Sequence, residues 1–69
     1  MDNMELKING ENKQFPLLHT VKELVDHLGL PLGRIAIELN GAIVRSPDWP
    51  TTSLHNGDAV EIVRFVGGG

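Results

Sequence analysis

Cysteine is absent from this chain of 69 residues, and aromatic side chains make up only 4% of it. A chain without cysteine has no disulfide framework and no thiolate nucleophile, and it cannot build a Cys/His zinc site. Its core must therefore come from Leu, Ile and Val. Because this length is close to the lower limit for a core that folds unaided, we expect a single domain.

Basic residues and long apolar runs are also scarce. Six Lys and Arg against nine Asp and Glu give a formal net charge of -3, and the basic residues are scattered along the sequence. A nucleic-acid-binding domain normally carries a basic stripe, so we expect no nucleic-acid partner. No apolar run is long enough to span a bilayer, and no basic segment followed by an apolar run opens the chain. We expect no membrane partner and a cytoplasmic protein.

Alternation of apolar and polar residues predicts the strands. They are expected at residues 4–8, 13–17, 34–39, 42–45 and 59–66. The Asn-Gly pairs at 9–10 and 40–41 tolerate positive φ and favour tight hairpins, with residues 11–12 assigned to the first turn. Pro16 cannot donate a ladder hydrogen bond, which predicts an edge position or the end of pairing there.

A short helix is predicted between the second and third strands. The segment 20–23, Thr-Val-Lys-Glu, matches a capping box, in which the Thr hydroxyl and the Glu carboxylate each accept from a free N–H of the first turn. Val21, Leu24, Val25 and Leu28 form one apolar stripe. Gly29 and then Pro31 end the helix, which we expect over residues 21–28. The turn-rich segment 46–53 is expected to be irregular, with Leu54 entering the core.

This order of elements indicates an α+β domain. A mixed sheet of four to five strands packed against one main helix buries both apolar faces, and the β-grasp, or ubiquitin-like, arrangement is the compact solution. We expect that domain over residues 1–66, with residues 1–3 as an extension. Residues 67–69 are expected to form a flexible glycine tail.

Enzymatic chemistry is not favoured by the side chains present. The three histidines, at positions 19, 27 and 55, lack metal-ligand spacing and are expected to be solvated. Ser46 and Ser53 have no nucleophile-elbow context, and no pair of carboxylates is singled out for acid/base work. The terminal glycines precede no helix and cannot form a phosphate loop. We therefore expect no catalytic residue and no cofactor or metal bound by the chain itself.

Two apolar features admit a structural or a binding interpretation. Trp49, the only tryptophan, either covers an edge of the core or anchors a partner. In the last strand, Ile62 is expected to face the core, which turns Val63 and Phe65 outward. These two residues either form a docking surface beside the C-terminus or are partly covered by neighbouring side chains.

The glycines at 67–69 form the thinnest thread that a chain can offer, and they end in a carboxylate. A carboxylate reacts with nucleophiles only after one oxygen becomes a leaving group, usually by adenylation with ATP. Since the chain shows no nucleotide site, the activating enzyme would be a separate protein. The alternative is a disordered end or a linker, although no serine spacer or affinity tag accompanies the glycines.

The wording of the sequence adds a resemblance to a family. The segment "NGDAVEIVRFVGGG", preceded by "IAIELNGAIV" and a tryptophan in the following loop, resembles the sulfur carrier proteins of thiamine biosynthesis, which are small and ubiquitin-like. The resemblance covers nearly the whole chain from about residue 4. The small subunit of molybdopterin synthase, which also ends in Gly-Gly, is a weaker match. A ubiquitin-like modifier and a plain interaction domain stay open as alternatives.

The resemblance implies a carrier cycle rather than catalysis. An E1-like adenylating enzyme, using ATP and magnesium, would activate Gly69, and sulfur from a cysteine desulfurase would convert it to a thiocarboxylate. Thiazole synthase would then accept the sulfur. In this scheme Gly69 carries the sulfur, while Gly67 and Gly68 extend the thread. Val63 and Phe65 fall where related carriers contact their partners.

Overall fold

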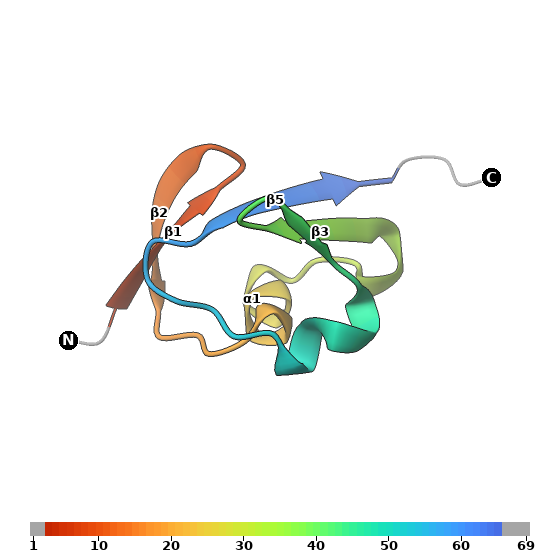
Figure 1. Cartoon of the computed structure of the whole chain (residues 1–69), viewed down its shortest axis with the longest axis horizontal. Helices are drawn as coiled ribbons and strands as arrows, with labels where there is room; N and C mark the ends of the chain where they lie inside the picture. The colour runs from red at the N-terminus through yellow and green to blue at the C-terminus, as the bar shows by residue number, and fades with distance from the viewer. Residues whose placement is uncertain (1–2, 66–69) are drawn as a thin grey trace.

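The computed structural model describes residues 3–65, the Leu32 side chain excepted. Within this range the chain forms five strands, one α-helix and two short 3-10 helices (Figure 1). The elements are β1 (Asn3–Ile8), β2 (Glu11–Pro16), α1 (Val21–Leu28), η1 (Leu32–Arg34), β3 (Ile35–Leu39), β4 (Ala42–Val44), η2 (Ser46–Thr51) and β5 (Ala59–Arg64). The predicted domain boundary at residue 66 and the predicted tail at 67–69 lie outside the described residues.

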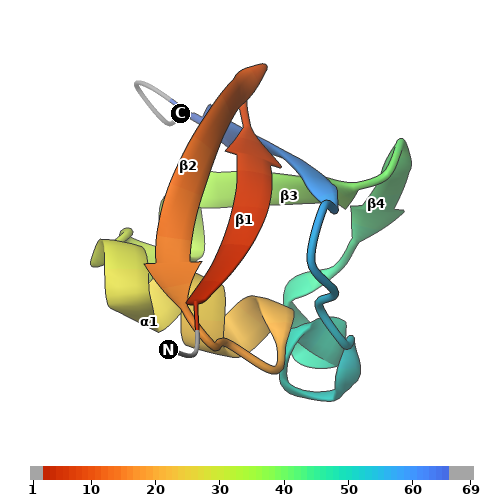
Figure 2. The same ribbon diagram turned by 90° about the vertical axis from the view of Figure 1, so that its left-hand side faces the viewer.

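The last strand lies in the middle of the sheet. The strand order is β2-β1-β5-β3-β4, with β5 parallel to β1 and antiparallel to β3, while the two hairpin pairs are antiparallel. Figures 1 and 2 show α1 against one face of this twisted sheet. A mixed sheet with one main helix packed on it is the β-grasp arrangement, so the predicted fold is confirmed. Pro16 lies at the end of an edge strand, as its missing N–H indicates.

Both Asn-Gly pairs form two-residue turns with positive φ at each residue. The φ angles are 50° and 87° for Asn9 and Gly10, and 51° and 88° for Asn40 and Gly41. Turns of this kind match the twist of the flanking strands, so pairing resumes at once, with Ile8 opposite Glu11. The expectation that residues 11–12 belong to the turn was therefore wrong.

The helix has the predicted bounds, with one difference at its cap. The Thr20 Oγ1 accepts from the Glu23 N–H at 3.2 Å, while the Glu23 carboxylate accepts from the His19 N–H at 2.6 Å. The Glu23 side chain therefore reaches the residue before the N-cap instead of closing the usual box on Thr20. Gly29 ends the helix in the left-handed conformation, with φ of 67°, as predicted.

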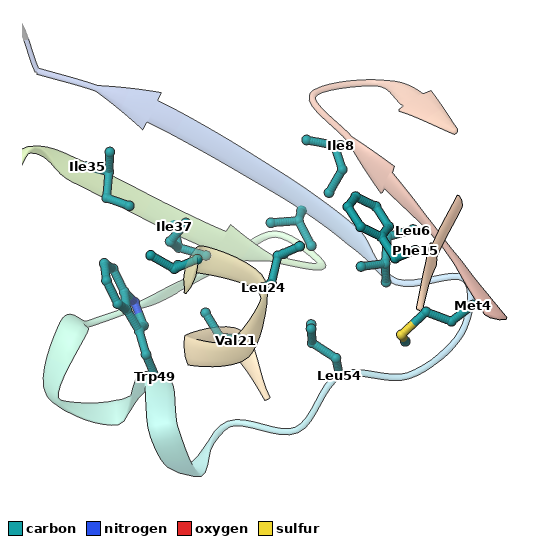
Figure 3. Packing of buried hydrophobic residues seen from close by; sticks show 12 residues of the cluster. Met4, Leu6, Ile8, Phe15, Val21, Leu24, Ile35, Ile37, Trp49 and Leu54 are labelled. Atoms are coloured by element: carbon teal, nitrogen blue, oxygen red, sulfur yellow. The ribbon is translucent and has the colours of Figure 1, made fainter. Parts of the chain in front are cut away.

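The core lies between α1 and the sheet (Figure 3). The buried apolar residues are Met4, Leu6, Ile8, Phe15, Val21, Leu24, Val25, Ile35, Ile37, Trp49, Leu54 and Val60. Trp49 is 2% exposed, and its indole N–H donates to the Val44 carbonyl oxygen at 2.8 Å. It therefore covers the core, and the partner-anchor interpretation is not supported. Leu54 enters the core as predicted.

The expected irregular excursion at 46–53 was wrong in one respect, because Ser46–Thr51 forms the 3-10 helix η2. The Asp48 N–H donates to the Arg45 carbonyl oxygen at 2.8 Å, and the Thr52 hydroxyl donates to the Asp48 carbonyl oxygen at 2.7 Å. These short-range bonds replace the α-helical ladder that Pro50 would interrupt. η2 thereby places Trp49 against the core.

Candidate functional site

The candidate site is the carboxyl end of β5, and the strand as a whole is held from both sides. The Asn9 side chain accepts from the Ile62 N–H at 2.7 Å and donates to the Ile62 carbonyl oxygen at 3.3 Å. Its backbone N–H donates to the Val60 carbonyl oxygen at 2.9 Å. The backbone pairing between β1 and β5 ends at Ile8, opposite Val60. Beyond that point the Asn9 side-chain amide makes the hydrogen bonds with β5 that a further residue of β1 would make.

Asn40 holds the first residue of β5 from the opposite side. Its N–H donates to the Ala59 carbonyl oxygen at 2.7 Å, its Oδ1 accepts from the Ala59 N–H at 3.0 Å, and its Nδ2 donates to Asp58 Oδ1 at 3.1 Å. The left-handed conformation of both asparagines aims these amides sideways at the neighbouring strand. The two Asn-Gly turns thus fix the position of β5 as well as closing the hairpins.

At its far end the strand stays attached to β3 through residue 65. Arg64 lies opposite Ile35 in the ladder, and the Phe65 N–H donates to the Arg34 carbonyl oxygen at 2.9 Å. The last strand ends at Arg64 in the structure, two residues before the predicted end, and Val66 lies outside the described residues. Residues 67–69 therefore follow a segment that is anchored almost to its last described residue.

The sheet face turned away from α1 carries an exposed apolar surface. Val63 is 49% exposed and Phe65 57% exposed, whereas Val60, on the opposite side of β5, is fully buried. The predicted outward orientation is therefore confirmed, and the proposed contact with partners stays a prediction. Ile43, in β4, is 71% exposed, and sequence reasoning missed it. Its alternation with the half-buried Val44 was the available signal.

Register pairs define which residues share this outer face. Val63 lies opposite Ala36, and Glu38 lies opposite both Glu61 and Ile43. We call these five residues the outer face. Two carboxylates directly opposite each other cost stability in a sheet, so the face combines an acidic pair with neighbouring apolar groups.

A pocket of about 420 Å³ opens beside the end of β5. β4 pairs with β3 only from Ile37 onward, whereas β5 pairs with it from Ile35, so the start of β3 has no strand on its β4 side. The pocket lies at this place, beside the start of β3, where β4 does not extend. Its lining includes Ile35, Ile37, Ile43, Arg45, Trp49 and Phe65.

The described residues hold no cluster of three or more His, Cys, Asp or Glu that could bind a metal ion. All three histidines are exposed, as expected. His19 and His55 lie 3.7 and 3.9 Å from Glu23 and Asp58, and His27 packs edge-on against Phe15 with ring centroids 5.7 Å apart. In residues 3–65 no helix has the length and apolar character that crossing a membrane requires.

The structure thus brings Val63 and Phe65 to the end of the central strand and adds Ile43 and the pocket beside them. Gly67, Gly68 and Gly69, which the sequence assigns to the tail and to the sulfur-carrying position, lie outside the described residues. Their role stays a prediction from the sequence.

Comparisons with known proteins point to one family. The model of the ThiS family matches residues 6–69. A crystal structure of the thiamine biosynthesis protein ThiS from Geobacter metallireducens is similar with a TM-score of 0.81 and 32% identity, covering 96% of this chain and 100% of that one. This neighbour shares both the fold and about a third of the aligned residues.

Two curated relatives are much longer than this chain. A thiazole synthase of Paramagnetospirillum magneticum is 39% identical over 66 residues, covering 96% of this chain and 20% of that protein. A thiazole synthase of Magnetococcus marinus is 32% identical over 66 residues, with the same coverage of 96% and 20%. This chain therefore spans one fifth of the length of these relatives. The family model, by contrast, matches nearly all of it, and the chain belongs to the ThiS family, the thiamine sulfur carriers that its sequence resembles.

Proposed function

We propose that this chain carries sulfur for thiazole formation in thiamine biosynthesis, as a thiocarboxylate on Gly69. The observation that supports this proposal best is the family match, because it runs through residue 69 and includes the terminal glycines as well as the folded domain. The chain acts as a co-substrate of partner enzymes, and the fold serves to present one reactive carboxylate. We place the cycle in the cytoplasm.

The proposed cycle starts with activation of the carboxylate. A carboxylate oxygen of Gly69 attacks the α-phosphate of ATP on an E1-like enzyme with magnesium, and pyrophosphate leaves. A persulfide sulfur, supplied from cysteine by a desulfurase, then attacks the acyl carbon and displaces AMP. A second thiol attacks the sulfur that came from the persulfide-bearing cysteine, forms a disulfide with it and releases the thiocarboxylate. The carrier needs no thiol of its own, in agreement with its lack of cysteine.

Presentation is the task of the chain's own residues. Fully extended, residues 67–69 reach about 10 Å beyond the preceding residue, so the carboxylate enters a narrow channel while the domain stays outside. Val63 and Phe65 contact the partner next to the channel opening, where their exposed apolar area becomes buried. The attachment of β5 on both sides holds the strand that carries this contact in place.

Thiazole synthase is the proposed sulfur acceptor. Two proteins named thiazole synthase each contain a segment similar to 96% of this chain. Joining a carrier and its acceptor in one polypeptide raises the effective concentration of one for the other, which benefits proteins that act together. The thiamine names of the matched family and structure also favour this carrier over the molybdopterin type.

Intact-mass analysis tests the proposal. The full chain is incubated with a thiamine-pathway adenylating enzyme, ATP, magnesium, cysteine and a desulfurase, and we expect a mass increase equal to sulfur minus oxygen. Fragmentation should locate the change on Gly69. A chain lacking Gly68 and Gly69 is the control and should stay unmodified. An unchanged mass for the full chain, under conditions that modify an established carrier, would refute the proposal, and lysine-linked adducts would indicate a modifier instead.

A further inference from the structure

The arginines of this chain, scattered in the sequence, come together at one end of the fold. Arg64 is the last residue of β5 and lies opposite Ile35. Arg34 directly precedes Ile35, and its carbonyl oxygen accepts a hydrogen bond from the Phe65 N–H. Arg45 follows β4 and lines the same pocket as Phe65. We call Arg34, Arg45 and Arg64 the arginine end. It comprises every arginine in the sequence.

These side chains are available to a partner. All three arginines are exposed, and none lies within ion-pair distance of a carboxylate of another described residue. Two of the three lysines, in contrast, have partners at 3.5 and 2.9 Å. Guanidinium groups are weakly hydrated and bind carboxylates through two parallel hydrogen bonds. With respect to residues 3–65, the three guanidinium groups therefore remain free to bind carboxylates of a partner, whereas two of the three lysine ammonium groups are already paired with carboxylates of the described chain.

The positive charge of the arginine end contrasts with the net negative charge of the chain as a whole. The chain has a formal net charge of -3, and the outer face carries the opposed carboxylates of Glu38 and Glu61. Along β5, Glu61 is followed by Val63 and then by Arg64, which alternates to the face of Ile62. The charge of the domain thus changes sign toward the end of β5, and a complementary surface fits it in one orientation, because the reverse orientation would place like charges together.

The pocket beside Phe65 indicates the kind of contact. Its lining combines apolar groups of β3 and β4 with Arg45 and the exposed Phe65, while the buried Trp49 belongs to the core below. Aromatic residues and arginine are the residue types that dominate binding energy at protein interfaces. A depression of this composition fits a protruding segment with acidic and apolar side chains.

We infer that the arginine end docks on an acidic surface of thiazole synthase, around the opening that receives the glycine tail. This inference rests on the proposed function and adds the chemistry of the partner surface. The positive end of a negatively charged carrier is drawn first toward that opening, so the tail arrives pointing inward. The acidic pair at Glu38 and Glu61 disfavours the reversed encounter.

Association kinetics test the inference. The full chain and its variants Arg34→Gln, Arg45→Gln, Arg64→Gln and the triple variant are mixed with purified thiazole synthase at low and high ionic strength. The matched control is Lys13→Gln, which removes one positive charge from β2, the opposite edge strand. We expect the triple variant to associate about tenfold or more slowly at low salt. At about 0.5 M salt the difference should shrink to within about twofold, since charges are then screened over a few Å.

Substitution by lysine separates charge from packing. Arg64→Lys keeps the charge and should restore most of the association rate, while Lys13→Gln should change it less than about twofold at low salt. Equal rates for the triple variant and Lys13→Gln would overturn the inference and leave the sulfur-carrier function standing. A wild-type chain that accepts sulfur in the mass assay and fails to bind thiazole synthase would overturn the inference together with the proposed acceptor.

Discussion

Asn9 shows most directly how one side chain determines the position of the candidate site. Its φ of 50° is a conformation that alanine resists and glycine accepts, and its amide makes two hydrogen bonds with Ile62. We expect Asn9→Gly to lower the free energy of unfolding by about 1–2 kcal/mol through the lost bonds. Asn9→Ala should cost about 1 kcal/mol more, because alanine pays for the left-handed conformation.

Urea unfolding of the two variants measures this difference. Asn12→Ala is a suitable control, because Asn12 is exposed in β2 and makes no side-chain hydrogen bond with another described residue. It should change the free energy of unfolding by less than about 0.5 kcal/mol. Equal stabilities for Asn9→Gly and Asn9→Ala would show that the backbone conformation at this turn carries no cost.

Individual residues also show which features of the site could be predicted from the sequence and which could not. The outward orientation of Val63 and Phe65 follows from period-two alternation, which is a local property of a strand. The grip of Asn9 on Ile62 spans 53 positions in the chain, and an Asn-Gly pair predicts only its own turn. Trp49 kept two interpretations because its burial depends on η2 and on the Val44 carbonyl oxygen, which local patterns do not locate.

At the scale of elements, α1 depends on its cap. The Thr20 hydroxyl accepts from the Glu23 N–H, and the backbone of the same region is attached to the segment before Leu54, with the Val21 N–H donating to the Thr52 carbonyl oxygen at 3.0 Å. We expect Thr20→Ala to lower the free energy of unfolding by about 1 kcal/mol, because one N–H of the first turn loses its acceptor. The backbone contacts with residue 52 should persist.

Thermal and urea unfolding of Thr20→Ala and Thr20→Ser check this expectation. Serine keeps the hydroxyl, so Thr20→Ser should retain most of the wild-type stability. A loss of equal size in both variants would assign the effect to the threonine methyl group rather than to the cap.

The bounds of an element were predicted well where capping residues next to it determine them, and less well where turn geometry or tertiary contacts do. The bounds of α1 follow from Thr20 and Gly29, which act within one turn of the helix. β2 starts two residues earlier than expected, because the Asn9-Gly10 turn, with positive φ at both residues, needs no further loop residue. η2 was missed because prolines at 47 and 50 argue against an α-helix and are compatible with a short 3-10 helix.

The whole molecule determines which exposed apolar residues gather near the carboxyl end of β5. The parallel pairing of β1 with β5 joins the two ends of the chain and places β5 in the centre, and no sequence pattern specified this order. The convergence of Arg34, Arg45 and Arg64 was hidden for the same reason. Composition alone described the basic residues as scattered, and only the strand order brings the three arginines to one end.

A comparison of apolar surfaces tests the proposed docking region at this scale. We expect the double variant Val63→Ser and Phe65→Ser to keep its free energy of unfolding within about 1 kcal/mol, because both side chains are about half exposed. Thiocarboxylate formation by the adenylating enzyme should slow at least tenfold, since lost anchors cost about 2 kcal/mol or more. Rates from intact-mass time courses provide the measurement.

Leu17 supplies the matched control for this variant. It is 50% exposed, similar to Val63, and it follows β2 at the other end of the sheet order. Leu17→Ser should leave the rate of thiocarboxylate formation within about twofold of wild type, because it removes apolar area from a surface outside the proposed contact. A comparable slowing in Leu17→Ser would refute the assignment of Val63 and Phe65 as the contact residues.

The central position of β5 has a mechanical consequence for a chain that is held by its C-terminus. Any pull along the tail is transmitted into a strand with neighbours on both sides, through its ladder with β3 and through the Asn9 and Asn40 amides. Such a load acts along the strand and strains many hydrogen bonds at the same time in shear, whereas a pulled edge strand opens them one after another. The described domain can therefore bear tension applied beyond the end of β5 and stay folded.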